Sequence, residues 1–207
     1  MRPRPMSRAA VLAGALSLAV PLTAPAPADA SAAVAVKKKR MHIRAGRQVS
    51  VVGTVQPRTG GVVAALQIHR RGRWRTIDRD RTAASGRYVL RDRVGRPQSV
   101  RARVLVSGTG RPLGRLNVYR AAYASWYGPG LYGNRLGCGG RLSPGRIGVA
   151  HKSLPCGSRL TLRHGARTVR VRVIDRGPYV GGREFDLTEA TAQRLRFRGH
   201  GSILSTR

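Results

Sequence analysis

Acidic residues are scarce in this chain of 207 residues, which has 8 aspartates and glutamates against 40 lysines and arginines. A formal net charge of +32 indicates a polyanionic partner, and nucleic acid is the first candidate. Lysine is scarce as well, occurring at positions 37–39 and 152, so that nearly every basic residue is arginine. This skew, amid many alanines and glycines, is typical of a GC-rich genome. Part of the charge therefore has a compositional origin, and the rest predicts adhesion to a polyanion.

Cysteine is nearly absent, and the two cysteines are Cys138 and Cys156. The chain contains no Cys-x-x-Cys or His-x-x-x-His spacing, which argues against a metal site, and no cofactor is expected. An even number of cysteines in an exported chain normally forms disulfides, and two allow one pairing. We therefore expect a Cys138–Cys156 disulfide, which would stabilise the fold by roughly 3 kcal/mol.

No apolar run is long enough to span a membrane. Residues 9–20 form a short apolar stretch, too short for roughly 30 Å of hydrocarbon. Three arginines precede it and the small-x-small site of residues 28–30 follows, the order found in secretory signal peptides. Residues 1–30 are therefore predicted to be a signal peptide cleaved near Ala30, with an uncleaved anchor as the alternative. No cysteine near this site would allow lipidation, and no stable membrane span is expected after cleavage.

Export changes the expected partner. Removal of residues 1–30 takes away three arginines and one aspartate, so the formal net charge falls from +32 to +30. An extracellular or wall-associated protein does not meet nucleic acid, so we expect none as a partner. Anionic wall polymers, acidic lipids and the carboxylates of peptidoglycan stems remain as partners that this charge would attract.

The mature chain is long enough for two small domains. Residues 31–40 form a short basic lead-in, and residues 41–119 contain short alternating segments separated by turns. This pattern predicts an antiparallel β-sandwich that resembles the immunoglobulin-like modules of bacterial surface proteins, serving as a spacer or wall-binding module. It contains no plausible catalytic cluster. The strands are expected at residues 48–53, 62–68, 73–77, 86–90 and 100–106.

The C-terminal segment, residues 121–204, differs from the preceding one in its content of aromatic residues and glycine. An aromatic strand near residues 123–128 leads into a glycine-rich excursion, and residues 159–163 and 168–174 are predicted to form a hairpin. A short helix should follow residue 187, because apolar residues recur there with helical spacing. Mostly β structure with one helix in about eighty residues indicates a small closed barrel. The expected fold is thus all-β, with a sandwich followed by a barrel.

Four motifs in this segment carry a family resemblance. They are ASWYG at 124–128, VAHKSLPCG at 149–157, VIDRGPY at 173–179 with GGR at 181–183, and FDLT at 185–188. In order and spacing these motifs resemble the rare lipoprotein A (RlpA) family, whose members are six-stranded double-psi β-barrels related to expansins. The best-studied members are lytic transglycosylases that cleave peptidoglycan glycan strands with formation of an anhydro ring.

The acids available for glycosidic cleavage are few. Cleavage requires a carboxylic acid near the leaving oxygen, and hydrolases normally add a second carboxylate. Among the four acids of the barrel segment, Glu189 suits a capping box with Asp186, and Glu184 would point away from Asp186 on a strand. Asp175 and Asp186 remain as candidates. A lytic transglycosylase needs no water nucleophile, because one carboxyl can protonate the bridging oxygen and then accept the proton of the muramic C6 hydroxyl.

The resemblance implies Asp175 as the acid/base, with His151 assisting through a hydrogen bond and Asp186 as a possible partner. Each residue also has a structural alternative: Asp175 as a turn residue, Asp186 as a helix N-cap, and His151 as a packing histidine. The neighbouring Arg176 would favour the ionised form of Asp175. Sugar-binding surface is expected from Trp126 and Tyr127, of which at most one can face a groove, and from Arg176 and Tyr179.

One departure from the family bears on activity. RlpA-like enzymes typically carry a Gly-Glu pair before the histidine motif, and its counterpart here is Gly139-Gly140. Two functions therefore stay open: a secreted peptidoglycan lytic transglycosylase, or a non-catalytic expansin-like module that binds and loosens wall polysaccharide. A purely adhesive display element is a third possibility.

Overall fold

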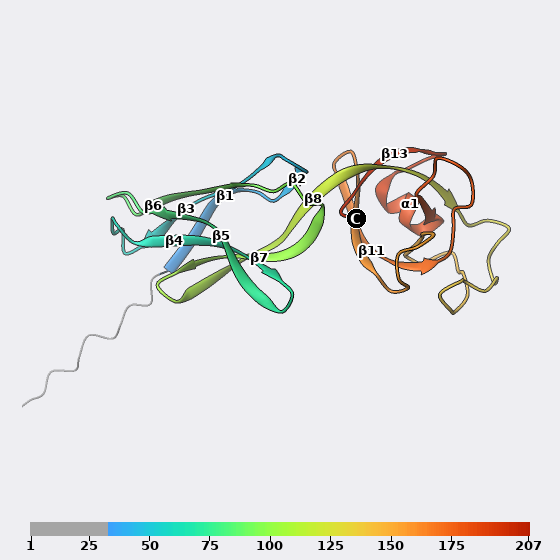
Figure 1. Cartoon of the computed structure of the whole chain (residues 1–207), viewed down its shortest axis with the longest axis horizontal. Coiled ribbons are helices and arrows are strands. Elements are labelled where there is room, and N and C mark those ends of the chain that lie inside the picture. The colour runs from blue at the N-terminus through green and yellow to red at the C-terminus, as the bar shows by residue number, and fades with distance from the viewer. Residues whose placement is uncertain (1–32) are drawn as a thin grey trace, which may run out of the picture. The chain divides into compact units, whose positions relative to one another are not determined.

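Strands make up most of the protein. The computed structural model describes residues 33–207, so the predicted signal peptide and the first two residues of the basic lead-in lie outside the described residues. One helix of seven residues accompanies the strands in the described part of the chain (Figure 1). The prediction of a mostly β protein is confirmed.

The first sheet is formed by β1 (Ala33–Arg40), β3 (Gln48–Gln56) and β6 (Arg87–Arg93), with β3 in the middle and both pairings antiparallel. Sequence reasoning gave residues 31–40 no secondary structure of their own. In the structure most of this segment is β1, because Val34 and Val36 alternate with more exposed neighbours and pack against the core.

The second sheet follows the order β5, β4, β7, β8, with β2 (His42–Arg44) pairing with β8 in parallel. β8 is a single strand of 19 residues, and its first half pairs with β7. The strands predicted at 62–68, 73–77 and 100–106 are all found in this sheet. Their observed bounds are Val63–Arg70 for β4, Arg73–Arg81 for β5, Gln98–Val106 for β7 and Thr109–Tyr127 for β8.

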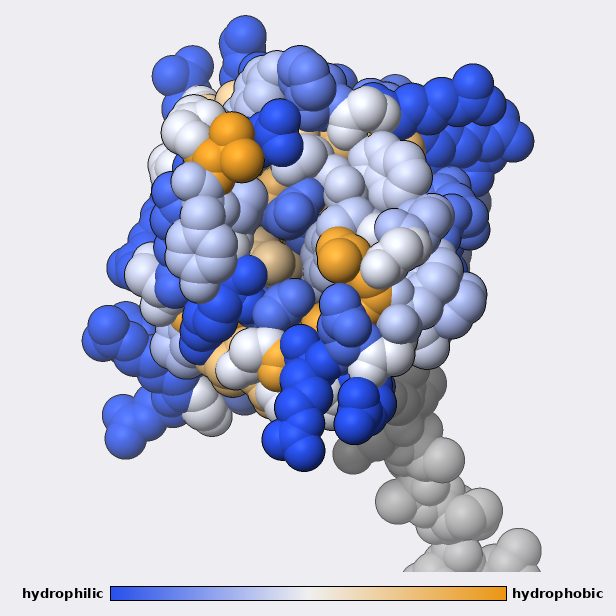
Figure 2. Space-filling view, turned by 90° about the vertical axis from the view of Figure 1, so that its right-hand side faces the viewer, coloured by the Kyte–Doolittle hydropathy of each residue, from blue (hydrophilic) through white to orange (hydrophobic). Residues whose placement is uncertain are grey.

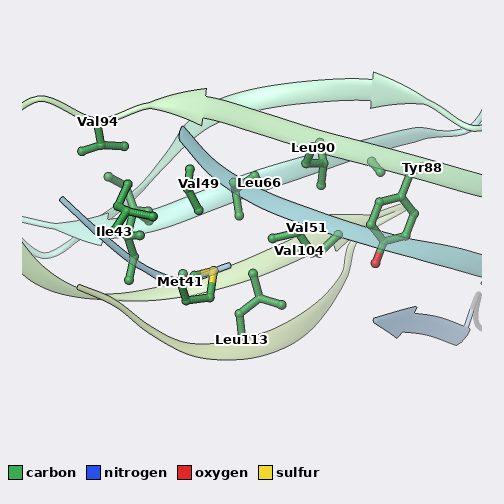
Figure 3. Packing of buried hydrophobic residues seen from close by; sticks show 14 of the residues in the cluster. Met41, Ile43, Val49, Val51, Leu66, Tyr88, Leu90, Val94, Val104 and Leu113 are labelled. Carbon is green, nitrogen blue, oxygen red and sulfur yellow. The ribbon is translucent and has the colours of Figure 1, made fainter. Parts of the chain in front are cut away.

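These two sheets share one apolar core (Figure 3). Val51 and Leu90 from the first sheet and Leu66 and Val104 from the second are fully buried in it. The buried Tyr88 closes one end of the core, and its hydroxyl donates a hydrogen bond to the carbonyl of Ala35 at 2.9 Å. Two sheets facing each other across such a core form a layered β structure.

The last six strands close into a barrel. From residue 120 onward β8 pairs with β13 and then with β12, and β12 also pairs with β9, so the sheet β12, β9, β11, β10, β13, β8 returns to its starting strand. Closure removes the exposed edges of a sheet. The hairpin of β10 and β11 confirms the one expected at residues 159–174. Bounds are Val149–Ala150 for β9, Arg159–His164 for β10, Arg167–Asp175 for β11, Phe185–Thr188 for β12 and Gly201–Ser205 for β13.

The barrel has a core of its own, formed by alternate residues of its strands and by one face of α1 (Glu189–Leu195). The N-cap of this helix is Thr188, whose hydroxyl accepts a hydrogen bond from the Thr191 amide. Of the two alternatives for Asp186, the helix N-cap is therefore excluded, because β12 continues to Thr188 and keeps Asp186 on the strand. The capping box with Glu189 fails for the same reason.

Among the described residues, no helix has the length and apolar character needed to cross a membrane.

Candidate functional site

Two carboxyls flank the same short strand of the barrel. Ala150 of β9 is the register partner of both Asp175 at the end of β11 and Asp186 on β12. With strands spaced at roughly 4.8 Å, the two aspartate backbones are about 10 Å apart, close enough for their side chains to interact. The structure thus places Asp175 and Asp186 on the two sides of β9, and His151 directly follows that strand. That the three form one catalytic site stays a prediction.

The carboxylate of Asp175 is held by backbone amides. Its Oδ1 accepts hydrogen bonds from the amide of Gly137 at 2.6 Å and from the amide of Arg176 at 2.8 Å. Gly137 can approach this closely because it has no side chain: a Cβ there would lie 2.8 Å from Cγ of Arg176. Sequence reasoning missed Gly137, and its place just before Cys138 is the signal that could have marked it.

Asp186 lies in a more enclosed position. Its Oδ1 accepts a hydrogen bond from the Ser125 hydroxyl at 2.8 Å, across the parallel pairing of β12 and β8. Burial raises the pKa of Asp186 above its ordinary value, and the negative charge of Asp175 raises it further. The Ser125 hydrogen bond and the charge of Arg183 oppose this shift without overcoming it. A carboxyl with a raised pKa keeps its proton more readily, as a general acid must.

Tyr127 completes this face of β8. Its hydroxyl is buried beside Asp175 and forms no hydrogen bond of ordinary geometry with any of the described residues. Burial is the main cause that raises the pKa of Tyr127, followed by the charges of Asp175 and Asp186, so the hydroxyl remains a proton donor beside both carboxyls.

Trp126 faces the other way, since neighbouring residues of a strand alternate. It lines a separate cavity of about 310 Å³ next to α1 and Phe197. Trp126 and Tyr127 thus face opposite sides of β8, and Tyr127 is the one beside the carboxyls.

The imidazole of His151 is fixed at both nitrogens. Its Nδ1 accepts hydrogen bonds from the amides of Ser153 at 3.1 Å and Leu154 at 3.0 Å, so the neutral ring carries its proton on Nε2. Nε2 lies 3.8 Å from Oε1 of Glu184, and the ring packs against Phe185 with centroids 5.0 Å apart. Burial lowers the pKa of His151, and the opposing charge of Glu184 does not reverse the shift.

Glu184 is the acid that sequence reasoning set aside. Both of its oxygens accept from the guanidinium of Arg120, in a paired arrangement that includes a contact of 2.7 Å. The expectation that strand alternation turns Glu184 away from Asp186 was wrong, because residues two apart on a strand share a face and Glu184 lies just before β12. The sequence gave no sign that His151 lies beside Glu184.

Arg176 holds the loop of the histidine motif through hydrogen bonds. Its guanidinium donates to the carbonyls of His151 at 3.1 Å and Leu154 at 2.7 Å, and to Sγ of Cys156 at 2.9 Å. Cys156 is disulfide-bonded to Cys138, with Cα atoms 5.5 Å apart, which confirms the predicted bridge. These contacts occupy Arg176 within the protein. Tyr179 is 81% exposed beyond the groove, and a contact of either residue with substrate stays a prediction.

The position of the missing family glutamate lies in a tight turn. Gly139 and Gly140 both have positive φ angles, +91° and +79°, and the Leu136 amide donates to the Gly140 carbonyl. A glutamate at position 140 would be strained in this left-handed conformation. The loop therefore differs in backbone conformation from one adapted to a side chain at that position.

Metal binding has no support from the side-chain positions: in residues 33–207, no three or more His, Cys, Asp or Glu side chains cluster in a way that could hold a metal ion. The barrel face seen in Figure 2 is mostly hydrophilic, with apolar residues scattered over it, as expected of a surface that meets a hydrated polymer.

Comparison with known proteins agrees with this geometry. Residues 119–204 match the family model described as lytic transglycolase, a double-psi β-barrel domain. The segment is 40% identical over 85 residues to a protein named probable endolytic peptidoglycan transglycosylase RlpA from Synechocystis. It is 42% identical over 79 residues to a protein of the same name from Aquifex aeolicus, and 41% identical over 81 residues to endolytic peptidoglycan transglycosylase RlpA from Neisseria meningitidis.

The closed six-stranded sheet and the family match define the C-terminal domain as a double-psi β-barrel of the lytic transglycosylase class. Within that class, residues 119–204 are similar to the RlpA-like relatives named above. The three alignments cover 40%, 37% and 38% of this chain and 26%, 35% and 34% of the relatives, so the chain spans about a third or less of the length of these relatives.

Proposed function

We propose that this protein is a secreted peptidoglycan lytic transglycosylase that cleaves the bond between N-acetylmuramic acid and N-acetylglucosamine and closes an anhydro ring. The observation that carries the proposal is the pairing of Asp175, held by two backbone amides, with Asp186, whose pKa is raised by burial. The RlpA-like relatives, named endolytic peptidoglycan transglycosylases, support the same substrate and reaction.

The two carboxyls have different roles in this proposal. Asp186, protonated more readily because its pKa is raised, donates its proton to the bridging oxygen as the glycosidic bond breaks. Asp175 accepts the proton of the C6 hydroxyl as that oxygen attacks the anomeric carbon. Each turnover leaves the proton on Asp175, and it returns to Asp186 through solvent or through the Tyr127 hydroxyl beside both carboxyls. Sequence reasoning gave both steps to Asp175; the raised pKa of Asp186 favours dividing them.

His151 is proposed to donate its Nε2 proton to a sugar oxygen, because Nδ1 is occupied by two amides. Glu184 is a positioning residue that holds the imidazole from the Nε2 side, 3.8 Å away, and is itself held by Arg120. This arrangement places a carboxylate beside the histidine in a domain that lacks the family glutamate at position 140.

A non-catalytic, expansin-like module is the second candidate. The observation that favours it is the turn at Gly139 and Gly140, which leaves the groove without a carboxylate from that loop. Such a module would bind wall polysaccharide through the same groove and release no product.

The rest of the chain is proposed to bring the barrel to the wall. We infer an immunoglobulin-like domain over residues 41–119, supported by two antiparallel sheets around one core, and a barrel domain over residues 121–204. The protein is inferred to be exported through the signal peptide of residues 1–30 and to associate with peptidoglycan glycan strands and anionic wall polymers. The high net charge supports the second partner.

The test separates binding from cleavage. Purified protein is incubated with insoluble peptidoglycan, and released and bound fractions are analysed for the wild type, Asp175→Asn and Asp186→Asn. The proposal predicts anhydro-muropeptides from the wild type, a loss of at least about a hundredfold in both variants, and unchanged sedimentation with the wall. Wild-type binding without any released product would instead support the expansin-like module.

A further inference from the structure

The outer face of the β10–β11 hairpin collects arginines without acidic partners. Arg159 and Arg172 are direct cross-strand partners, and Arg170 lies two residues from Arg172 on the same face. All three are exposed, while the residues between them on the opposite face, such as Val171, are buried in the barrel core. Like charges placed directly opposite each other destabilise a β pairing unless an anion lies between them.

This face is also concave. Ile147 and Val171 line a surface hollow of about 490 Å³ together with the three arginines. No acidic residue lines it, and of the arginines in residues 33–207 only Arg120 forms an ion pair with a carboxylate. The acids of the barrel are engaged elsewhere: Asp175 with backbone amides, Asp186 with Ser125, Glu184 with Arg120 and Glu189 with Tyr132.

We propose that Arg159, Arg170 and Arg172 form a binding site for a phosphodiester polymer of the cell wall, separate from the catalytic groove. Guanidinium groups bind phosphate oxygens in pairs, and successive phosphates of a flexible chain can contact successive arginines. The bound polymer neutralises the Arg159–Arg172 pair and holds the barrel at the wall. This inference does not depend on the proposed catalytic activity.

An acidic lipid surface fits this face less well. Proteins that bind membrane surfaces combine basic residues with apolar side chains that enter the headgroup region. Of the large apolar side chains exposed in the described part of the chain, none belongs to the hairpin; they are Val63, Tyr123, Trp126, Leu131, Tyr179 and Val180.

The experiment compares two full-length variants of equal charge. The site variant carries Arg159→Gln, Arg170→Gln and Arg172→Gln. The control carries Arg73→Gln, Arg75→Gln and Arg79→Gln on β5, which are also exposed strand residues. Binding to poly(glycerol phosphate) is measured by calorimetry at several salt concentrations, and the thermal midpoint of each variant verifies folding. Vesicles of phosphatidylglycerol and peptidoglycan stripped of anionic polymer are the other two probes.

We expect the site variant to bind poly(glycerol phosphate) at least about tenfold more weakly than the wild type, with a smaller salt dependence, and the control to lose about threefold or less. The site variant should unfold at a temperature no lower than that of the wild type, because the cross-strand repulsion is removed. Equal losses in the two variants would overturn the proposal in favour of a diffuse charge effect. Absence of polymer binding, or site-dependent binding of the vesicles or stripped peptidoglycan instead, would also overturn it.

Discussion

At the scale of single residues, burial distinguishes the two carboxyls proposed to act in catalysis. Asp175 and Asp186 have the same chemistry in water, yet one ends a strand under two backbone amides and the other lies inside the barrel wall beside Ser125. The pKa of a carboxyl depends on such surroundings, because burial disfavours the charged form. The sequence motifs identified both aspartates as candidates. Their different surroundings could not be predicted, because Gly137 lies 38 residues from Asp175 along the chain and Ser125 lies 61 residues from Asp186.

The raised pKa of Asp186 predicts how stability depends on pH. The folded-state pKa lies above the unfolded value, so the stability that protonated Asp186 contributes is present at low pH and is lost as pH rises through the folded pKa. Asp186→Asn is neutral at every pH and should therefore gain stability relative to the wild type as pH rises from the unfolded pKa through the folded pKa of Asp186, with no further change above it. Chemical denaturation of both proteins across pH 3 to about 8 measures this difference. A difference in unfolding free energy that is constant across the range would contradict the assignment.

The contact between Glu184 and His151 predicts a coupled change in pKa and turnover. The charge of Glu184 raises the pKa of His151, so Glu184→Gln should lower that pKa further. Loss of orientation of the imidazole should reduce kcat by about tenfold to a hundredfold with little change in KM. NMR titration of His151 and kinetics of product release provide the two readouts. Glu189→Gln, on the adjacent helix, is the matched control, and an effect of the same size there would remove Glu184 from its role.

Loops and strand ends determine the site at the scale of elements. The strands that carry Asp175 and Asp186 were predictable from alternation of apolar residues. Three features could not be predicted: the two-residue β9, the strand β13 and the full length of β8. β9 and β13 are too short to show an alternating pattern, and few turn signals mark where β8 begins and ends. β9 is the strand that brings the two aspartates together, so the geometry of the site depended on an element too short to predict.

The disulfide connects the loop that holds Asp175 with the loop of the histidine motif. Cys138 follows Gly137, whose amide donates to Asp175, and Cys156 lies within the histidine motif. Replacing both cysteines by serine should lower the free energy of unfolding by roughly 3 kcal/mol, because the bridge closes a loop of this length. Product release should fall as well, since Gly137 loses its fixed position. Thermal unfolding with and without reductant measures the first effect, and wild-type protein in reductant should behave like the variant. Unchanged stability of both would contradict this role.

The turn at Gly140 predicts that the family glutamate cannot simply be restored. Gly140→Glu places a side chain at a φ of +79°, which costs about 1 kcal/mol or more. We therefore expect a lower thermal midpoint and no increase in product release. Gly145→Glu, at a position with open space and no left-handed φ, is the control for added charge. A rise in activity from Gly140→Glu without a loss of stability would mean that the loop accepts the family arrangement.

At the scale of the whole molecule, the described residues contain two large apolar cores, and the strand β8 contributes residues to both. Chain length and sequence pattern predict two domains, and this stays a prediction. In the described residues the two largest apolar clusters lie before residue 119 and in the barrel. Arginine-rich strand faces were predicted to be solvated or adhesive, and composition alone could not separate these alternatives. The structure distinguishes one arginine group by its hollow and by the absence of acids around it.

The central claim is that the barrel closes an anhydro ring without water. Purified peptidoglycan is digested in water enriched in oxygen-18, and the released muropeptides are analysed by mass spectrometry. The account predicts anhydro-muropeptides that carry no label and are lost with Asp175→Asn or Asp186→Asn. Labelled reducing ends would indicate a hydrolase, and the absence of any released muropeptide from a protein that still binds the wall would contradict catalysis altogether.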